Sequence, residues 1–109
     1  MSLLVYGINH RTAPLQLREK IAFSESEQPQ SIQNLLSGNS SVKECFIVST
    51  CNRTEIYCSI ESGNSENIKH WLTNEKPVSN EELLNCSYEY WDRDAVSHMS
   101  KVACGLDSM

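Results

Sequence analysis

The fold is decided by residues 42–61, VKECFIVSTCNRTEIYCSIE. Residues 42–48 form a segment typical of a β-strand, and in residues 55–61 apolar side chains alternate onto one face. The polar residues 50–54 between them predict a turn. The stretch therefore predicts a β-hairpin whose turn carries a thiol and a guanidinium.

The turn of this hairpin places Cys51 two residues before Arg53. A thiol has an unperturbed pKa of about 8.5, so it needs positive charge nearby to be mostly thiolate at neutral pH. Arg53 could supply that charge, or it could hold a substrate carboxylate through two parallel hydrogen bonds. Either role predicts acyl chemistry on an acidic substrate.

Outward from the hairpin, the chain alternates between strand and helix patterns. The predicted elements are a strand at 3–8, helices at 14–23 and 32–38, further helices around 68–72 and 79–84, a strand at 88–91 and a last helix at 92–105. This order predicts an α+β fold, in which a four-stranded antiparallel sheet is covered on one face by helices in a ferredoxin-like sandwich.

Local signals predict where several of these helices begin. Ser24 with Glu27, and Ser79 with Glu82, have the spacing of capping boxes. Asp92 is the expected N-cap of the last helix, since its carboxylate can accept a hydrogen bond from a free backbone amide.

Length and composition indicate one globular domain. The chain has 109 residues, of which 39% are hydrophobic and 21% charged. No apolar run approaches the roughly 20 residues that span a bilayer, and no basic region leads into an apolar one at the N-terminus. We therefore expect no membrane association and a cytoplasmic location.

The net charge of −5 lies entirely in the second half of the chain, where residues 61–109 carry nine acids and four bases. Sequence-independent binding to a nucleic-acid backbone depends on many Lys and Arg contacts to phosphate. The charge distribution argues against such binding, so any nucleic acid is expected to be contacted only locally.

The cysteines are expected to be reduced thiols, because their number is odd and no export signal precedes them. No C-x-x-C pair or His/Cys cluster has the spacing of a zinc site, so no metal is expected. Only the hairpin-turn cysteine lies in a polar segment. The five are Cys45, Cys51, Cys58, Cys86 and Cys104.

Four motifs occur in order along the chain: GINHRTAP at 7–14, LREK at 17–20, STCNRTEIY at 49–57 and VACGLDSM at 102–109. With them the chain resembles the N-terminal catalytic domain of glutamyl-tRNA reductase, and residues 62–91 match only in layout. The resemblance implies that residues 1–109 are this substrate-binding domain. Members of the family continue into an NADPH-binding domain and a dimerisation domain, which are expected to be absent here.

The resemblance also implies a reaction. The family reduces the glutamate esterified to tRNA to glutamate-1-semialdehyde, the first committed step of tetrapyrrole (porphyrin, haem) biosynthesis by the five-carbon route. A cysteine thiolate displaces the tRNA ribose hydroxyl to give a thioester, which hydride from NADPH then reduces. The matching positions are Cys51 as nucleophile, His98 as the histidine needed for activity, and Thr50, Asn52, Arg53 and Ser108 as glutamyl-binding residues.

The residues alone leave the role of His98 open. It lies on the inward face of the last helix, three residues after Ala95 and four before Val102. There an imidazole could accept the thiol proton or protonate the leaving ribose oxygen, or it could only bond a backbone carbonyl at the edge of the core. Glu55 is left out of the predicted site, because a strand glutamate two residues after Arg53 can simply pair with it or face solvent.

Partners and cofactor follow from the same resemblance. The expected partners are the acceptor end of glutamyl-tRNA, glutamate-1-semialdehyde aminomutase and, in full-length members, a second subunit. The chain has no G-x-G-x-x-G stretch between a strand and a helix, so NADPH is expected to bind outside it, and the domain alone should be only a slow esterase. Two other functions remain: a non-catalytic module that binds tRNA or a pathway partner, and a redox-sensing thiol protein.

Overall fold

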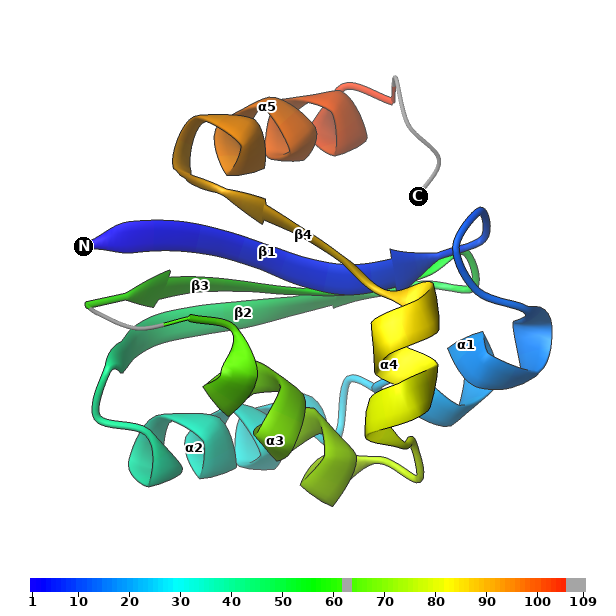
Figure 1. The fold of residues 1–109 in the computed structure, drawn as a ribbon, viewed down its shortest axis with the longest axis horizontal. Helices are drawn as coiled ribbons and strands as arrows, with labels where there is room; N and C mark the ends of the chain where they lie inside the picture. Colours follow the sequence, from blue (N-terminus) through cyan, green and yellow to red (C-terminus); the bar gives the residue numbers. More distant parts are fainter. Residues whose placement is uncertain (62–63, 106–109) are drawn as a thin grey trace.

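The computed structural model describes residues 1–61 and 64–105 (Figure 1). Strands and helices alternate along this part of the chain much as the sequence predicts. The elements are β1 (Ser2–Asn9), α1 (Leu15–Ile21), α2 (Gln28–Gly38), β2 (Val42–Ser49), β3 (Arg53–Ile60), α3 (Glu66–Glu75), α4 (Asn80–Cys86), β4 (Tyr88–Trp91) and α5 (Asp92–Ala103).

The four strands form one sheet in the order β2-β3-β1-β4, and every neighbouring pair is antiparallel. This arrangement confirms the predicted α+β class and the ferredoxin-like sheet. The hairpin turn is shorter than predicted, because β3 already begins at Arg53. The backbone N–H of Thr50 closes the turn by donating to the Arg53 carbonyl at 2.8 Å.

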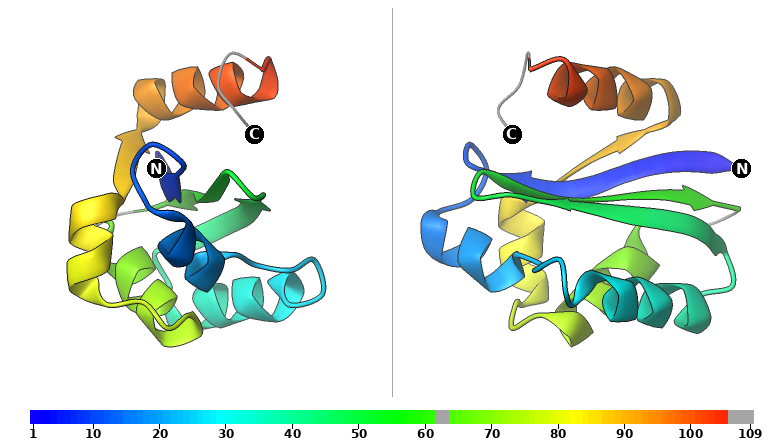
Figure 2. Two further views of the ribbon diagram at one scale, coloured as in Figure 1. Left: turned by 90° about the vertical axis from the view of Figure 1, so that its right-hand side faces the viewer. Right: turned by 180° about the vertical axis from the view of Figure 1, so that it is seen from behind.

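One face of the sheet carries the main apolar core, beneath α1, α2, α3 and α4 (Figures 1 and 2). Alternate residues of the two central strands point to this face, including the Ile56, Cys58 and Ile60 set that the alternation predicts. Trp71 of α3 stacks on Phe23 with ring centroids 5.7 Å apart and donates its indole N–H to the Ser31 carbonyl at 3.0 Å. These contacts join α3 to α2 and to the segment before it.

The opposite face is covered by α5 (Figure 2), whereas the prediction placed the helices on one face. Val5, Tyr57 and Ala95 form a second, smaller core there, against which Met99 packs. The physical reason lies in the central strands. Both have buried side chains on each face, so the sheet needs cover on both sides.

Helix starts agree with the sequence at one of the three predicted caps. Ser79 and Glu82 form a complete capping box before α4. The Ser24 side chain does not cap α2; it donates to the Glu27 carboxylate instead. Asp92 is the first residue of α5, with a φ of 50°, and its carboxylate accepts from the Leu3 N–H of β1 at 3.0 Å.

Candidate functional site

A buried carboxylate, that of Glu55, lies at the centre of the α5-covered face. Glu55 is 0% exposed. Its Oε1 accepts from the Tyr57 hydroxyl at 2.7 Å, and its Oε2 accepts from Arg53 Nη1 at 3.1 Å and from the Tyr88 hydroxyl. His98 Nε2 contacts the same Oε2. Glu55 is therefore bonded to residues of β3, β4 and α5.

Strand alternation builds most of this cluster. Arg53, Glu55 and Tyr57 are two residues apart on β3, so their side chains point to the same face. Gly7 of β1 pairs with Glu55 on one side and with Tyr88 on the other. A Cβ on Gly7 would lie 2.9 Å from Glu55 Cγ and 2.5 Å from the Thr54 carbonyl oxygen. The glycine thus leaves the space that the carboxylate occupies.

Two tyrosine hydroxyls serve this cluster as donors. Burial, followed by hydrogen bonding to the Glu55 carboxylate, raises the pKa of Tyr57 and of Tyr88 well above the ordinary value. Both hydroxyls therefore keep their protons across the physiological range and donate to Glu55.

His98 reaches the cluster from α5, and its side chain is only 7% exposed. Its imidazole stacks on the Tyr90 ring with centroids 4.6 Å apart and lies tilted to the Tyr88 ring at 5.7 Å. Its hydrogen-bond partner is the Glu55 carboxylate, and not a backbone carbonyl at the edge of the core. The ring is thus oriented by one contact with a carboxylate oxygen and by two aromatic neighbours.

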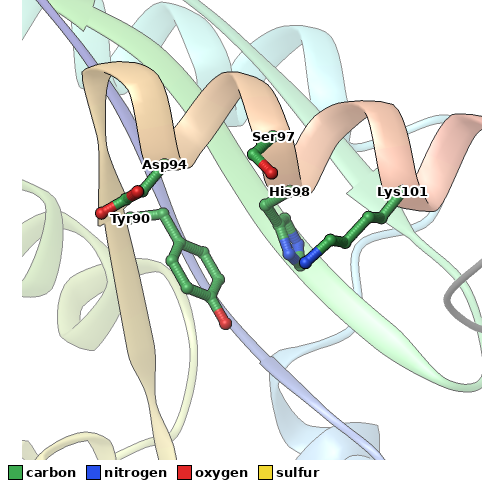
Figure 3. A pocket seen from close by; sticks show the side chains of 5 residues that line it. All are labelled: Tyr90, Asp94, Ser97, His98 and Lys101. Carbon is green, nitrogen blue, oxygen red and sulfur yellow. The ribbon is translucent and has the colours of Figure 1, made fainter.

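A cavity of about 160 Å³ opens beside His98 (Figure 3). Figure 3 shows His98 and Lys101 extending from α5 toward the space beside the Tyr90 ring. An imidazole, an ammonium, a phenol and a carboxylate can therefore meet a bound molecule here. The lining residues are Tyr90, Asp94, Ser97, His98 and Lys101.

Cys51 lies in the hairpin turn and is exposed. It lines a separate cavity of about 160 Å³ between the turn and α1, together with Thr50 and Arg18. Arg18 Nη1 donates to the Cys51 carbonyl oxygen at 2.9 Å. A guanidinium thus stands beside the thiol turn, and it comes from the LREK motif of α1.

Two of the other thiols are unsuited to nucleophilic attack at neutral pH. Cys45 and Cys58 lie directly opposite one another on β2 and β3. Burial raises the pKa of Cys45 to about 11 and that of Cys58 to about 12, and the neighbouring Cys45 contributes to the second shift. Cys104, at the end of α5, is exposed like Cys51 and is its natural control.

The predicted site residues divide between two places. Thr50, Cys51 and Asn52 lie in the turn, while the Arg53 side chain is buried against Glu55 on the α5-covered face. Cys51 and His98 line different cavities. Ser108 lies outside the described residues.

Sequence reasoning missed Glu55, its two tyrosine partners and Arg18. The strand period did place Arg53, Glu55 and Tyr57 on one face, and a glutamate there is costly to bury without donors. That signal would have mattered only if a helix had been expected over this face.

Residues 1–61 and 64–105 contain neither a metal-binding cluster nor a membrane-spanning helix. No group of three or more His, Cys, Asp and Glu side chains in this part could hold a metal ion. No helix there is long and apolar enough to cross a membrane.

The fold and the site define a ferredoxin-like domain with an exposed thiol in a hairpin turn and a buried carboxylate–histidine pair under a separate helix. The family model described as "Glutamyl-tRNAGlu reductase, N-terminal domain" matches residues 6–109, and the chain belongs to this family.

Individual relatives agree with the family. The chain is 45% identical over 109 residues to glutamyl-tRNA reductase of Pseudoalteromonas translucida, and 44% identical over 109 residues to that of Neisseria gonorrhoeae; the match covers 100% of this chain and 26% and 25% of those proteins. The chain thus spans about a quarter of their length. The solved structure of glutamyl-tRNA reductase from Methanopyrus kandleri matches 98% of this chain and 23% of that one, with a TM-score of 0.73 and 23% identity, and supports the fold.

Proposed function

We propose that this domain binds the acceptor end of glutamyl-tRNA and forms a thioester between Cys51 and the glutamyl group. This is the first half of an NADPH-dependent reduction to glutamate-1-semialdehyde in tetrapyrrole biosynthesis. The support is membership of the glutamyl-tRNA reductase N-terminal family and relatives that carry that enzyme's name. The proposed location of the reaction is the cytoplasm.

The observation that carries the proposal is the position of Cys51. It is an exposed thiol in the STCNRTEIY motif, with the Arg18 guanidinium bonded to its own carbonyl group. An exposed thiol can reach a macromolecular substrate, and the Arg18 guanidinium brings a positive charge to the turn that carries it. The buried Cys45 and Cys58 have neither property.

The proposed step is an acyl transfer. The Cys51 thiolate attacks the ester carbonyl, the C–S bond forms, the C–O bond to the ribose breaks, and the ribose oxygen takes a proton. His98 is the proposed proton donor to that oxygen, since an imidazole can take up and release a proton at a ring nitrogen. Thr50, Asn52, Arg53 and Ser108 are the proposed glutamyl-binding residues.

The second half of the reaction requires NADPH, and this chain does not fit the fingerprint of a dinucleotide site. Its glycines, at positions 7, 38, 63 and 105, do not form a G-x-G-x-x-G stretch between a strand and a helix. We assign no hydride step to any residue of the chain. Glutamate-1-semialdehyde aminomutase and a second reductase subunit remain proposed partners of full-length members of the family.

Mass spectrometry of the chain after exposure to glutamyl-tRNA tests the proposal. We expect a glutamyl adduct on Cys51, no adduct with Cys51→Ser, and an unchanged adduct with the matched variant Cys104→Ser. Without reduction the thioester should hydrolyse slowly, so glutamate and not the semialdehyde is the expected product even with NADPH added. An adduct that survives Cys51→Ser would contradict the assignment. Binding of tRNA without any adduct would favour the interaction module.

A further inference from the structure

We propose that Glu55 is a positioning residue: it fixes the neutral His98 ring with its proton on Nε2, so that Nδ1 is the nitrogen that exchanges a proton with the substrate. The inference rests on the proposed function for the use of that proton. The arrangement itself is a property of the cluster under α5.

The acceptor sites of the carboxylate decide the tautomer. An ionised carboxylate offers about four acceptor sites and no proton. Arg53 Nη1, the Tyr57 hydroxyl and the Tyr88 hydroxyl all donate to it. Arg53 carries donors only, and its Nη1 lies 3.1 Å from the Oε2 that His98 contacts, so this oxygen acts as an acceptor. His98 Nε2 must then be the fourth donor.

The second ring nitrogen of His98, Nδ1, is the one that can exchange a proton with a bound molecule. In residues 1–61 and 64–105, Nε2 is the ring nitrogen of His98 that takes part in a hydrogen bond. The ring lines the cavity with Tyr90, Ser97 and Lys101. Because Nε2 is held by Glu55, a proton can pass between the imidazole and a molecule in that cavity only at Nδ1.

The proton balance of the ester cleavage then has defined atoms. Protonated His98 carries N–H groups on both nitrogens, and Nδ1 gives its proton to the ribose oxygen as the C–O bond breaks. The ring that remains is neutral, with its proton on Nε2. Glu55 orients the ring throughout the step, which is the role of a carboxylate behind a catalytic histidine.

Several charged and titratable groups lie in the Glu55 cluster or line the cavity beside His98. On β3 these are Arg53, Glu55 and Tyr57, on β4 Tyr88 and Tyr90, and on α5 Asp94 and Lys101. Among them Glu55 is the group that contacts a ring nitrogen. Replacing it therefore changes the tautomer more directly than replacing any of the others.

Nitrogen-15 NMR of the histidine ring in the 109-residue chain tests the arrangement without any substrate. In the neutral ring we expect the proton of His98 to lie predominantly on Nε2. Tyr57→Phe is the matched control, since Tyr57 donates only to Oε1, and it should keep the same tautomer. A predominant Nδ1–H form, or equal amounts of both forms in the wild type, would overturn the proposal.

A double-mutant cycle on the rate of thioester formation tests the use of that nitrogen. Both His98→Asn and Glu55→Gln should slow the reaction by about 10²- to 10⁴-fold, the range of a proton transfer. The double variant should be no slower than His98→Asn, because both changes remove the same step. If the rate losses of the two single variants multiplied in the double variant, Glu55 would act only through the stability of the fold. Absence of any thioester in the wild type would refute the proposed function and leave the NMR result to decide the tautomer.

Discussion

The two faces of the sheet are built from the same strands but differ in what they bury. Under α1, α2, α3 and α4 the strands present apolar side chains, and the core there is large. Under α5 the apolar core is small, and beside it lie a buried guanidinium, a carboxylate and an imidazole. One face therefore stabilises the domain chiefly through apolar burial, and the other buries ionisable side chains.

The α5-covered face needs its helix because it buries charged groups. Arg53 and Glu55 are 1% and 0% exposed, so each depends on the other and on the surrounding donors. Without α5 these groups would lose both their histidine partner and their shielding from water. The helix makes the electrostatic interactions beneath it stronger, since charges interact more strongly away from water.

The largest expected effect comes from breaking the buried ion pair. Arg53→Met should destabilise the domain by about 3–5 kcal/mol, because it leaves the buried Glu55 carboxylate without its guanidinium. Lys43→Met is the matched control on β2, where the Lys43–Glu61 pair is 47% and 62% exposed; it should cost about 0–1 kcal/mol. Urea unfolding of the two variants measures the difference. Equal costs would mean that the two faces do not differ in this respect.

A conservative exchange at the same position separates charge from geometry. Arg53→Lys keeps the positive charge but loses the planar fork, so thioester formation should slow even where the domain stays folded. Adduct formation measured beside the unfolding curve checks this. Unchanged kinetics with Arg53→Lys would show that charge alone suffices at this position.

A smaller effect is expected from filling the space beside Glu55. Gly7→Ala should cost about 1–3 kcal/mol, because the new Cβ would lie 2.5 Å from the Thr54 carbonyl oxygen, a backbone atom that cannot move away alone. Gly38→Ala at the end of α2 has nothing within 4 Å and should be neutral or slightly stabilising. Thermal unfolding of both variants decides. If Gly7→Ala unfolded at the same temperature as the wild type, the α5-covered face would be able to relax around the added methyl group.

The smallest expected effect is a pH dependence on the other side of the sheet. The Lys76 side chain, followed by Ser24, lowers the pKa of Glu27 to about 2 from an ordinary 4.5. A lowered pKa in the folded state contributes stability above about pH 4.5, and this contribution is lost as the pH falls toward 2. Glu27 is 41% exposed, so the contribution should stay below about 1 kcal/mol.

Comparison of the wild type with Glu27→Gln at pH 7 and pH 2 measures this contribution. The difference in unfolding free energy should be present at pH 7 and absent at pH 2. A difference that persists at pH 2 would indicate that packing of the Glu27 stem, not its charge, is responsible.

Much of the fold follows from local patterns in the sequence. Alternation on the hairpin strands and the order of apolar segments predict the antiparallel sheet, and Ser79 with Glu82 predicts the start of α4. The face covered by α5 could not be predicted in the same way. Whether Glu55 faces water or a buried histidine depends on where a helix 43 residues later in the chain is placed, since their contact spans that separation.

The same dependence on contacts between distant segments limits how much of the candidate site could be predicted from the sequence. The STCNRTEIY motif identifies the thiol turn, because turn and motif are local. The partnership of Arg53 with Glu55 and of Arg18 with the turn depends on side-chain direction and on contacts across the fold. Site residues on one segment could be predicted, while the partners that set their chemistry could not.

The late position of α5 in the chain has a consequence for synthesis. On the ribosome β1, β2 and β3 are complete once Ile60 has emerged, while β4 and α5 follow at residues 88–103. At about 5–20 residues per second, the roughly 40 residues between Ile60 and the end of α5 take about 2 to 9 seconds. The growing domain can thus assemble much of its apolar side first, with Glu55 still hydrated, and the α5-covered face should be the last part of the newborn chain to become dry.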